Sequence, residues 1–269
     1  MIKIFQKLIF NNENSKLNKK SIASVIEEYK ESKNKNLHFL VNERFTWMQQ
    51  FINKTDVGLE VGAGAAFSKN LINAKTLYTS DYSNDNHLDY QNIDAEKTGF
   101  EDLKYDFVIA SNMMHHVPHP ILFLEEMYRI LKPGGRLIIF EPHVSMIYQL
   151  VTFFTKHEGF DFTVDVWNKN KSVKQNNNPW DSNQAVAYLL FKNHELFHKN
   201  INYKFKIIYD KFAEFMIFLN SSGIYSKGFH IPLNFTILKI INLIDIFLIK
   251  LFPNIFALGR KIVLVKNKE

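Results

Sequence analysis

Residues 57–64 read Val57-Gly-Leu-Glu-Val-Gly-Ala-Gly64. A short apolar run that carries one acid, Glu60, ends here in two glycines separated by one residue. The pattern is typical of a buried parallel strand that runs into a tight loop, where a ligand can contact the backbone because glycine has no Cβ. A second acid, Asp81, follows the next apolar run, at 77–80. The sequence therefore predicts a site for a nucleoside-containing cofactor.

The residue at position 67 separates this loop from dinucleotide-binding loops. In those loops a third glycine at this position lets the helix pack closely over a pyrophosphate, whereas this chain has Phe67. No Gly-Lys-Ser/Thr triplet occurs either, so a phosphate-binding loop for nucleoside triphosphates is excluded. NAD, FAD and ATP are all disfavoured as ligands.

The segment 54–142 alternates predicted strands with predicted helices. Lys132-Pro-Gly-Gly135 ends one helix and turns the chain into the next strand. This alternation predicts a parallel sheet with helices on its faces. The predicted strands are 57–61, 77–80, a short one at 90–93, 106–110 and 136–140, and the predicted helices are 66–73 and 120–131.

The segments on either side of this core are predicted to be mostly helical. Residues 1–53 form a helical approach, with helices at 21–30 and 37–53. Residues 143–258 are predicted to build a substrate cap that contains one core strand near 204–210. Residues 259–269 hold the last core strand, at 262–265.

Six short motifs across 57–141 resemble the class I S-adenosylmethionine-dependent methyltransferases that act on small molecules, the methyltransferase type 11-like group. Each motif falls at a predicted strand end or turn, and all six stand in the same order as in the family. They are Leu59-Glu-Val-Gly-Ala-Gly64, Thr79-Ser-Asp81, Asn92-Ile-Asp-Ala-Glu96, Tyr105-Asp-Phe-Val-Ile-Ala110, Met114-His-His-Val-Pro118 and Arg129-Ile-Leu-Lys-Pro-Gly-Gly135.

The resemblance implies an α/β fold, with a doubly wound, Rossmann-like sheet of seven strands, and S-adenosyl-L-methionine as cofactor. Glu60 would support the glycine loop and the cofactor's amino group, and Asp81 would accept both ribose hydroxyls. Asp94 would accept the adenine amino group. The other expected cofactor-binding residues are Gly62, Ala63, Gly64, Tyr82, Ala95 and Ser111.

Three residues at the ends of the fourth and fifth strands are predicted to be catalytic: His115, His116 and Glu141. Methyl transfer to a hydroxyl needs a base, and a histidine beside a carboxylate can serve as one. The alternative is that one histidine packs under the cofactor while the other caps the loop. No metal is predicted, because the spacings of His115, His116, His119, His143, His157 and Glu141 match no known ligand motif.

The acceptor is expected to be a small molecule, with O-methylation of a sugar or lipid-linked surface glycan, as in polysaccharide biosynthesis, as the first hypothesis. Polar clusters at 157–161, 179–184 and 220–223 suit a sugar, but they suit loop capping equally well. One alternative is C- or N-methylation of another small molecule, such as a lipid or quinone-like acceptor. Another is a non-catalytic Rossmann protein that binds a nucleoside.

The composition bears on partners and location. The net charge is +6, but basic residues are mixed with acids, so no nucleic-acid partner is predicted. The absence of cysteine and of a signal peptide suggests a cytoplasmic protein. No membrane-spanning helix is predicted.

The polar stripe of the apolar helix Leu233–Leu251 favours a buried cap helix, and peripheral membrane contact through 233–251 is the alternative. The oligomeric state stays open.

Overall fold

The computed structural model describes residues 1–10, 20–31, 34–156, 158–174, 178, 180–225 and 228–268. Its strands are β1 (Lys7–Leu8), β2 (Val57–Val61), β3 (Thr76–Ser80), β4 (Tyr105–Ser111), β5 (Leu131–Pro142), β6 (Phe160–Asp161), β7 (Phe205–Ala213) and β8 (Gly259–Lys266). Its α-helices are α1 (Ile22–Lys30), α2 (Lys35–Thr46), α3 (Ser68–Leu71), α4 (Pro120–Ile130), α5 (Met146–Thr155), α6 (Val186–Phe191), α7 (His194–Asn200), α8 (Met216–Leu219), α9 (Phe235–Leu251) and α10 (Pro253–Phe256). Short 3-10 turns, η2 (Trp47–Phe51) and η3 (Met114–His116), follow α2 and β4.

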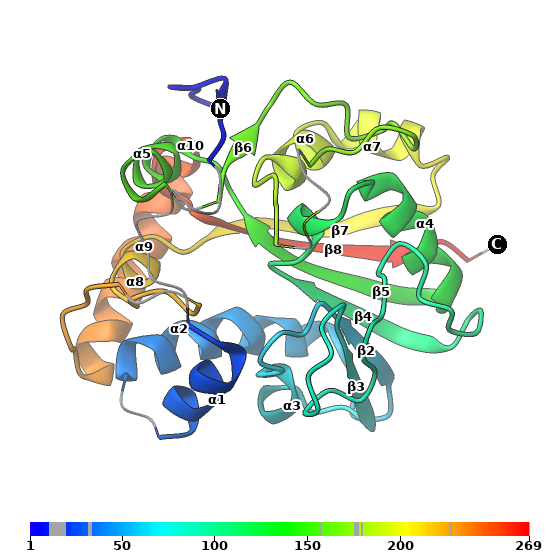
Figure 1. The fold of residues 1–269 in the computed structure, drawn as a ribbon, viewed down its shortest axis with the longest axis horizontal. Coiled ribbons are helices and arrows are strands. Elements are labelled where there is room, and N and C mark those ends of the chain that lie inside the picture. Colours follow the sequence, from blue (N-terminus) through cyan, green and yellow to red (C-terminus); the bar gives the residue numbers. More distant parts are fainter. Residues whose placement is uncertain are drawn as a thin grey trace.

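Within the described residues the main sheet has six strands in the order β3-β2-β4-β5-β8-β7 (Figure 1). Strands β3, β2, β4 and β5 are parallel, while β8 lies antiparallel between β5 and β7. The carboxyl ends of β2, β4 and β5 therefore meet at one edge of the sheet. This mixed α/β sheet confirms the Rossmann-like fold class.

The sheet differs from the expected seven strands at 90–93. There the chain makes only a single parallel bridge between Ser80 and Tyr90. The positive φ of 55° at Asn92 bends the backbone away from an extended course. The segment Lys132–Gly135 is predicted from the sequence to be a turn before the strand at 136–140. It lies instead within β5, which begins at Leu131. Leu131 pairs with Tyr105 and Arg136 pairs with Phe107, so the four residues bulge out of the ladder between two pairs.

Helices cover both faces of the sheet, as a doubly wound fold requires. Along β4, Val108 and Ala110 belong to a core cluster that includes α4 and α6, whereas Phe107 and Ile109 belong to a cluster that includes α1 and α2. Figure 1 shows α4, α6 and α7 on one side of the sheet and α1, α2 and α3 on the other. The alternation follows from the two-residue period of a strand that is buried on both faces.

The N-terminal helices pack against the end of the glycine loop, where α3 begins. The ring of Tyr29, from α1, stacks on His38 at 4.0 Å and lies 4.5 Å from Phe67, between ring centroids. Asn34 caps α2 by accepting a hydrogen bond from the backbone N–H of Leu37. Phe67 therefore fills the space that a third glycine would leave open, which gives its physical role in this fold.

Helix α9 is not the buried cap helix that its polar stripe favours. Only Leu238, Asp245 and Ile249 are buried along its length. Asn242 donates to Glu43 and Asp245 accepts from the start of α8, so half of the stripe faces the protein. Most of the apolar side chains face outward. In the described part of the chain, no helix is long and apolar enough to cross a membrane.

Candidate active site

The glycine loop follows β2 at the carboxyl edge of the sheet. Gly62 and Gly64 have φ angles of +65° and +50°, in the left-handed region that favours glycine. A Cβ on Gly62 would lie 2.6 Å from the Cβ of Met113, so the loop after β2 touches the loop after β4. The backbone N–H of Ala63 donates to the carbonyl of Ser80 over 3.0 Å. The loop is thus held against the end of β3 and against the loop after β4.

Asp81 lies against this loop, as its position after the second strand of the core suggests. Its Oδ2 accepts from the backbone N–H of Gly64 at 2.9 Å, and its Oδ1 accepts from that of Ser83 at 2.9 Å. A carboxylate offers about four lone-pair sites, so two remain for a ligand. His87, whose Nε2 lies 2.7 Å from the carbonyl of Gly64, supports the same turn.

Glu60 is buried beneath the glycine loop. The hydroxyl of Ser68, at the start of α3, donates to its carboxylate. Burial raises the pKa of Glu60 to about 8; the Ser68 hydrogen bond opposes this shift, while the charge of Asp81 adds to it. A cation that binds nearby would therefore favour loss of the proton from the Glu60 carboxyl group.

The other expected cofactor residues lie along the same edge but do not form one contact group. Tyr82 is exposed, and Ala95 is buried. Asp94 caps its own turn by accepting from the backbone N–H of Glu96 at 2.8 Å. Ser111 ends β4, where it pairs with Phe140. These four assignments stay predictions, as do the cofactor contacts expected of Glu60, Gly62, Ala63, Gly64 and Asp81.

His115 and Glu141 form a buried pair next to the loop. The Nδ1 of His115 lies 2.5 Å from the Oε2 of Glu141, and both side chains are almost inaccessible. The other carboxylate oxygen accepts from the backbone N–H groups of Met113 and Met114 at 2.9 and 2.8 Å. The pair predicted from sequence is therefore brought together, and the backbone holds Glu141 in place.

The two neighbouring histidines carry opposite shifts. Burial by itself lowers the pKa of His115, but the charges of Glu141 and Glu158 outweigh it and raise that pKa to about 9. Burial, helped by the charge of His115, lowers the pKa of His116 to about 4. The Nδ1 of His116 lies 3.2 Å from the carbonyl of Asp181, which can only accept. Neutral His116 therefore carries its proton on Nδ1 and has a free lone pair on Nε2.

Glu158 lies at the site, although the sequence analysis did not predict a role for it there. Its Oε2 lies 3.6 Å from the Nε2 of His115 and accepts from the amide of Gln184. His115, His116 and Glu158 offer three ligand atoms within 4.8 Å of one another, so this cluster could hold a metal ion. A protonated His115 between two carboxylates also accounts for the cluster without a metal, and the absence of a metal stays a prediction.

The other histidines considered from sequence lie outside this cluster. His143 is buried between the rings of Tyr188 and Phe212, and burial lowers its pKa to about 3. His119 pairs with Glu96, with Nδ1 3.0 Å from the carboxylate. His157 lies outside the described residues. Position along the chain alone did not separate these side chains from the His115 pair.

Tyr225 is a second residue that sequence reasoning missed. Its hydroxyl accepts from the backbone N–H of Ala65 at 3.0 Å, and a Cβ on Gly64 would lie 2.2 Å from it. A segment from the far end of the chain therefore reaches the glycine loop. No local sequence signal could have placed it there.

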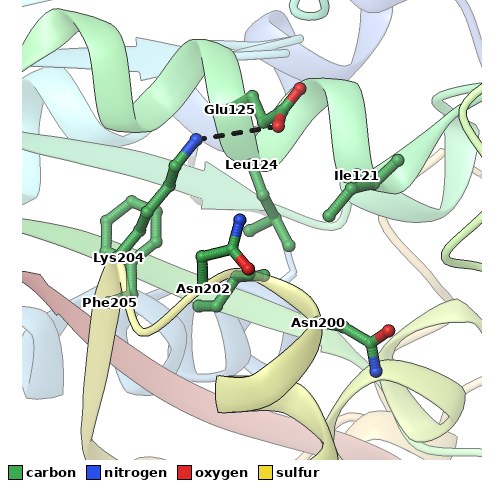
Figure 2. A pocket seen from close by; sticks show the side chains of 8 residues that line it. Ile121, Leu124, Glu125, Asn200, Asn202, Lys204 and Phe205 are labelled. Carbon is green, nitrogen blue, oxygen red and sulfur yellow. Dashed lines mark ion pairs between the residues drawn. The ribbon is translucent and has the colours of Figure 1, made fainter.

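A separate small pocket lies at the opposite edge of the sheet. Figure 2 shows its lining, with Lys204 directed toward Glu125, to which it is joined over 3.7 Å. Phe205, which also lines it, is the first residue of β7, and β7 runs parallel to β5. The pocket is therefore away from the carboxyl ends where the glycine loop and His115 meet.

A solved structure shares this architecture. The S-adenosylmethionine-dependent methyltransferase from Archaeoglobus fulgidus aligns with a TM-score of 0.50 and 15% identity, covering 84% of this chain and 93% of its own. At that identity the likeness shows the fold. The fold of this chain is therefore the Rossmann-like fold of an S-adenosylmethionine-dependent methyltransferase.

Residues 59–139 match the family model described as a methyltransferase domain. S-adenosylmethionine is accordingly its cofactor. The loop residues fit it, because Gly62 and Gly64 hold the left-handed backbone of the loop and the Asp81 carboxylate, with two hydrogen bonds accepted, keeps two lone-pair sites for ribose hydroxyls beside the loop.

Two relatives are similar over the same region. The ubiquinone/menaquinone biosynthesis C-methyltransferase UbiE of Desulfotalea psychrophila is 31% identical over 98 residues, which are 35% of this chain and 38% of that protein. The highly reducing polyketide synthase PKS6 of Gibberella zeae is 44% identical over 70 residues, which are 24% of this chain and 3% of that protein. The chain thus spans well under half of the length of these relatives.

Proposed function

We propose that this protein is an S-adenosylmethionine-dependent methyltransferase that transfers the methyl group to a hydroxyl oxygen of a small-molecule acceptor. One observation carries the proposal. The glycine loop and the His115–Glu141 pair lie at the same sheet edge and are joined through the contact of Gly62 with Met113. The ring of His116 lies 4.3 Å from that of His115, between centroids, so the glycine loop and a proton-accepting side chain lie at the same sheet edge and can serve one reaction.

The cofactor, when bound, supplies an activated methyl group. Gly62 and Gly64 would admit it to the backbone, Glu60 would face its amino group and Asp81 its ribose. The contribution of the chain is to hold the acceptor oxygen in line and to remove its proton.

His116 is the residue proposed to take that proton. It is neutral at physiological pH, and its Nε2 lone pair is free because Nδ1–H is directed at Asp181. A hydroxyl proton becomes strongly acidic as the oxygen gains the methyl group, so a weakly basic imidazole can still accept it. His115, held as a cation by Glu141 and Glu158, is proposed to position His116 and the acceptor.

The structure weakens the argument for a glycan acceptor. Polar side chains of the cap that suit a sugar are used within the protein. Asn183 bonds the backbone of Asp161 and Ala185, and Asn220 bonds both backbone groups of Ile231. Loop capping explains them, so the acceptor is proposed only as a hydroxyl-bearing small molecule.

A second candidate is methyl transfer to carbon. Its support is the similarity to UbiE, which is a C-methyltransferase by name. The same proton acceptor would serve an acidic carbon acceptor. The two candidates differ in the atom that carries the methyl group in the product.

The test uses methyl-labelled cofactor with the purified full chain and fractionated small-molecule and lipid extracts. We expect a product that gains one labelled methyl group, and the carbon-13 chemical shift of that group separates an O-methyl from a C-methyl product. His116→Gln should keep cofactor affinity by calorimetry and lower turnover by about 10²-fold or more. His119→Gln is the matched control. Full activity of His116→Gln would refute the assigned base, and cofactor binding without any labelled product would favour a non-catalytic nucleoside-binding protein.

A further inference from the structure

Helix α9 presents an unusually apolar face to solvent. Leu243 and Phe247 are 67% and 61% exposed, near the middle of a 17-residue helix. Single exposed apolar side chains are ordinary, but a contiguous apolar face marks an interaction surface. The residues of this face, called the α9 face below, are Phe235, Ile237, Ile240, Leu243, Ile244, Ile246, Phe247 and Leu251.

The apolar surface continues beyond α9 at the same end of the molecule. Helix α10 follows α9 directly and packs against α5, and Figure 1 shows the three helices together at one end. On α5, Phe154 is 66% exposed and Phe153 stacks on Phe5. Before α9, Phe229 is 87% exposed. Exposed aromatic side chains therefore also occur on α5 and in the segment before α9.

The acidic and the basic residues of α9 lie on different sides of the helix. Its single acid, Asp245, is buried and accepts from the backbone N–H groups of Met216 and Ile217 at 3.1 and 3.0 Å. Its two lysines, Lys239 and Lys250, are exposed. They lie about three turns apart and so share one flank of the α9 face. The outward side of the helix is thus apolar with a positive flank and carries no acid.

We propose that the α9 face is a docking surface for an anionic lipid bilayer, on which the helix lies parallel to the membrane plane. The apolar side chains would enter the acyl boundary while Lys239 and Lys250 extend to the headgroups. The net charge of +6 adds long-range attraction to an anionic surface.

A bilayer fits this surface better than a second copy of the chain does. In a self-contact, the lysines of each copy would be desolvated against a face that offers no carboxylate, because Asp245 is directed inward. A bilayer lets the same lysines stay hydrated beside phosphate groups. Docking here does not depend on the proposed methyl transfer.

The test is cosedimentation of the full chain with vesicles of phosphatidylcholine containing phosphatidylglycerol, and with vesicles of phosphatidylcholine alone. We expect binding to the anionic vesicles that weakens as salt rises. The double variant Leu243→Ser/Phe247→Ser should lose about tenfold or more per residue, since each buries a large apolar side chain. Lys239→Gln/Lys250→Gln should lose about fivefold per lysine.

The matched control is Leu103→Ser/Ile208→Ser, which removes two comparably apolar exposed side chains outside this surface. Circular dichroism and cofactor calorimetry verify that every variant is folded. Absence of vesicle binding by the wild type, or equal binding by the serine variant and the control, overturns the proposal. A dimer in sedimentation equilibrium that only Leu243→Ser/Phe247→Ser dissociates would assign the face to a second copy instead.

Discussion

At the residue scale, burial gives one side chain of the expected cofactor site a protonation state that its sequence position does not reveal. The family resemblance implies that Glu60 supports the loop and the cofactor's amino group. The structure encloses it beneath the loop with Ser68 as its hydrogen-bond donor. A buried carboxyl that is neutral at physiological pH can ionise when a cation arrives, because the two charges then offset the desolvation.

Cofactor affinity should therefore depend on pH through Glu60. In the free protein its pKa of about 8 keeps it protonated below that pH. Pairing with the cofactor's ammonium group would lower this pKa, so binding should release a proton below pH 8. Affinity should rise as pH increases toward 8 and then level off. Calorimetry in two buffers with different ionisation enthalpies measures the released proton.

Glu60→Gln is the control for this linkage. Glutamine keeps the shape and can still bond Ser68, but it cannot release a proton. We expect weaker binding whose dependence on pH across 6–8 is largely lost. An unchanged pH profile in Glu60→Gln would show that another group is responsible.

At the element scale, the strands of the core could be read from the sequence because each is a short apolar run that ends in a turn signal. Val57–Val61 and Tyr105–Ser111 are examples, and both match their predicted positions within a residue or two. The strand expected at 90–93 does not form, since a left-handed residue at Asn92 interrupts it. Asparagine adopts a positive φ more readily than most residues, but the sequence alone does not show which asparagine does so.

The glycine loop makes an element-scale prediction about stability. Gly62→Ala should lower the free energy of unfolding, because alanine at φ +65° costs about 1–2 kcal/mol in backbone energy. Its Cβ would also lie 2.6 Å from that of Met113, which adds a steric penalty. Urea unfolding should show the loss, and calorimetry should show weaker cofactor binding.

Gly99→Ala separates the two contributions. Gly99 has a φ of +71°, and no described residue beyond its chain neighbours comes within 4 Å of the place that a Cβ would take, so this variant carries the backbone penalty alone. We expect it to lose less stability than Gly62→Ala and to keep cofactor affinity. Equal losses in both variants would mean that the contact with Met113 is unimportant.

At the scale of the whole molecule, the sequence predicted the core well and the cap poorly, for a physical reason. The core residues act with neighbours that are near in sequence or one strand away. Glu158 and Tyr225, by contrast, reach the site from the cap across long stretches of chain. The sequence also did not decide whether the apolar side of α9 is exposed, because the same polar stripe occurs in a helix that is fully buried and in one buried on a single side.

A buried ion pair connects helix α2 with the segment that follows β7. The last prediction concerns its contribution to stability. Arg44, on α2, donates from Nε and a terminal nitrogen to Glu214, just after β7, over 2.6 and 2.7 Å. Both side chains are nearly inaccessible, and the guanidinium also lies over the rings of Phe140 and Phe218. Glu214→Gln leaves this buried cation without its counter-charge. We expect urea unfolding to show a loss of about 3–5 kcal/mol.

Glu125→Gln provides the contrasting case, since it weakens two ion pairs at the surface, with Lys169 and with Lys204. An exposed pair contributes about 0–1 kcal/mol, because water and salt screen it. The double variant Arg44→Met/Glu214→Gln should recover part of the loss, since the unpaired charge is then removed. If Glu214→Gln unfolds at the same urea concentration as Glu125→Gln, the pair does not hold α2 against the cap, and the attachment of the N-terminal helices must depend on apolar packing alone.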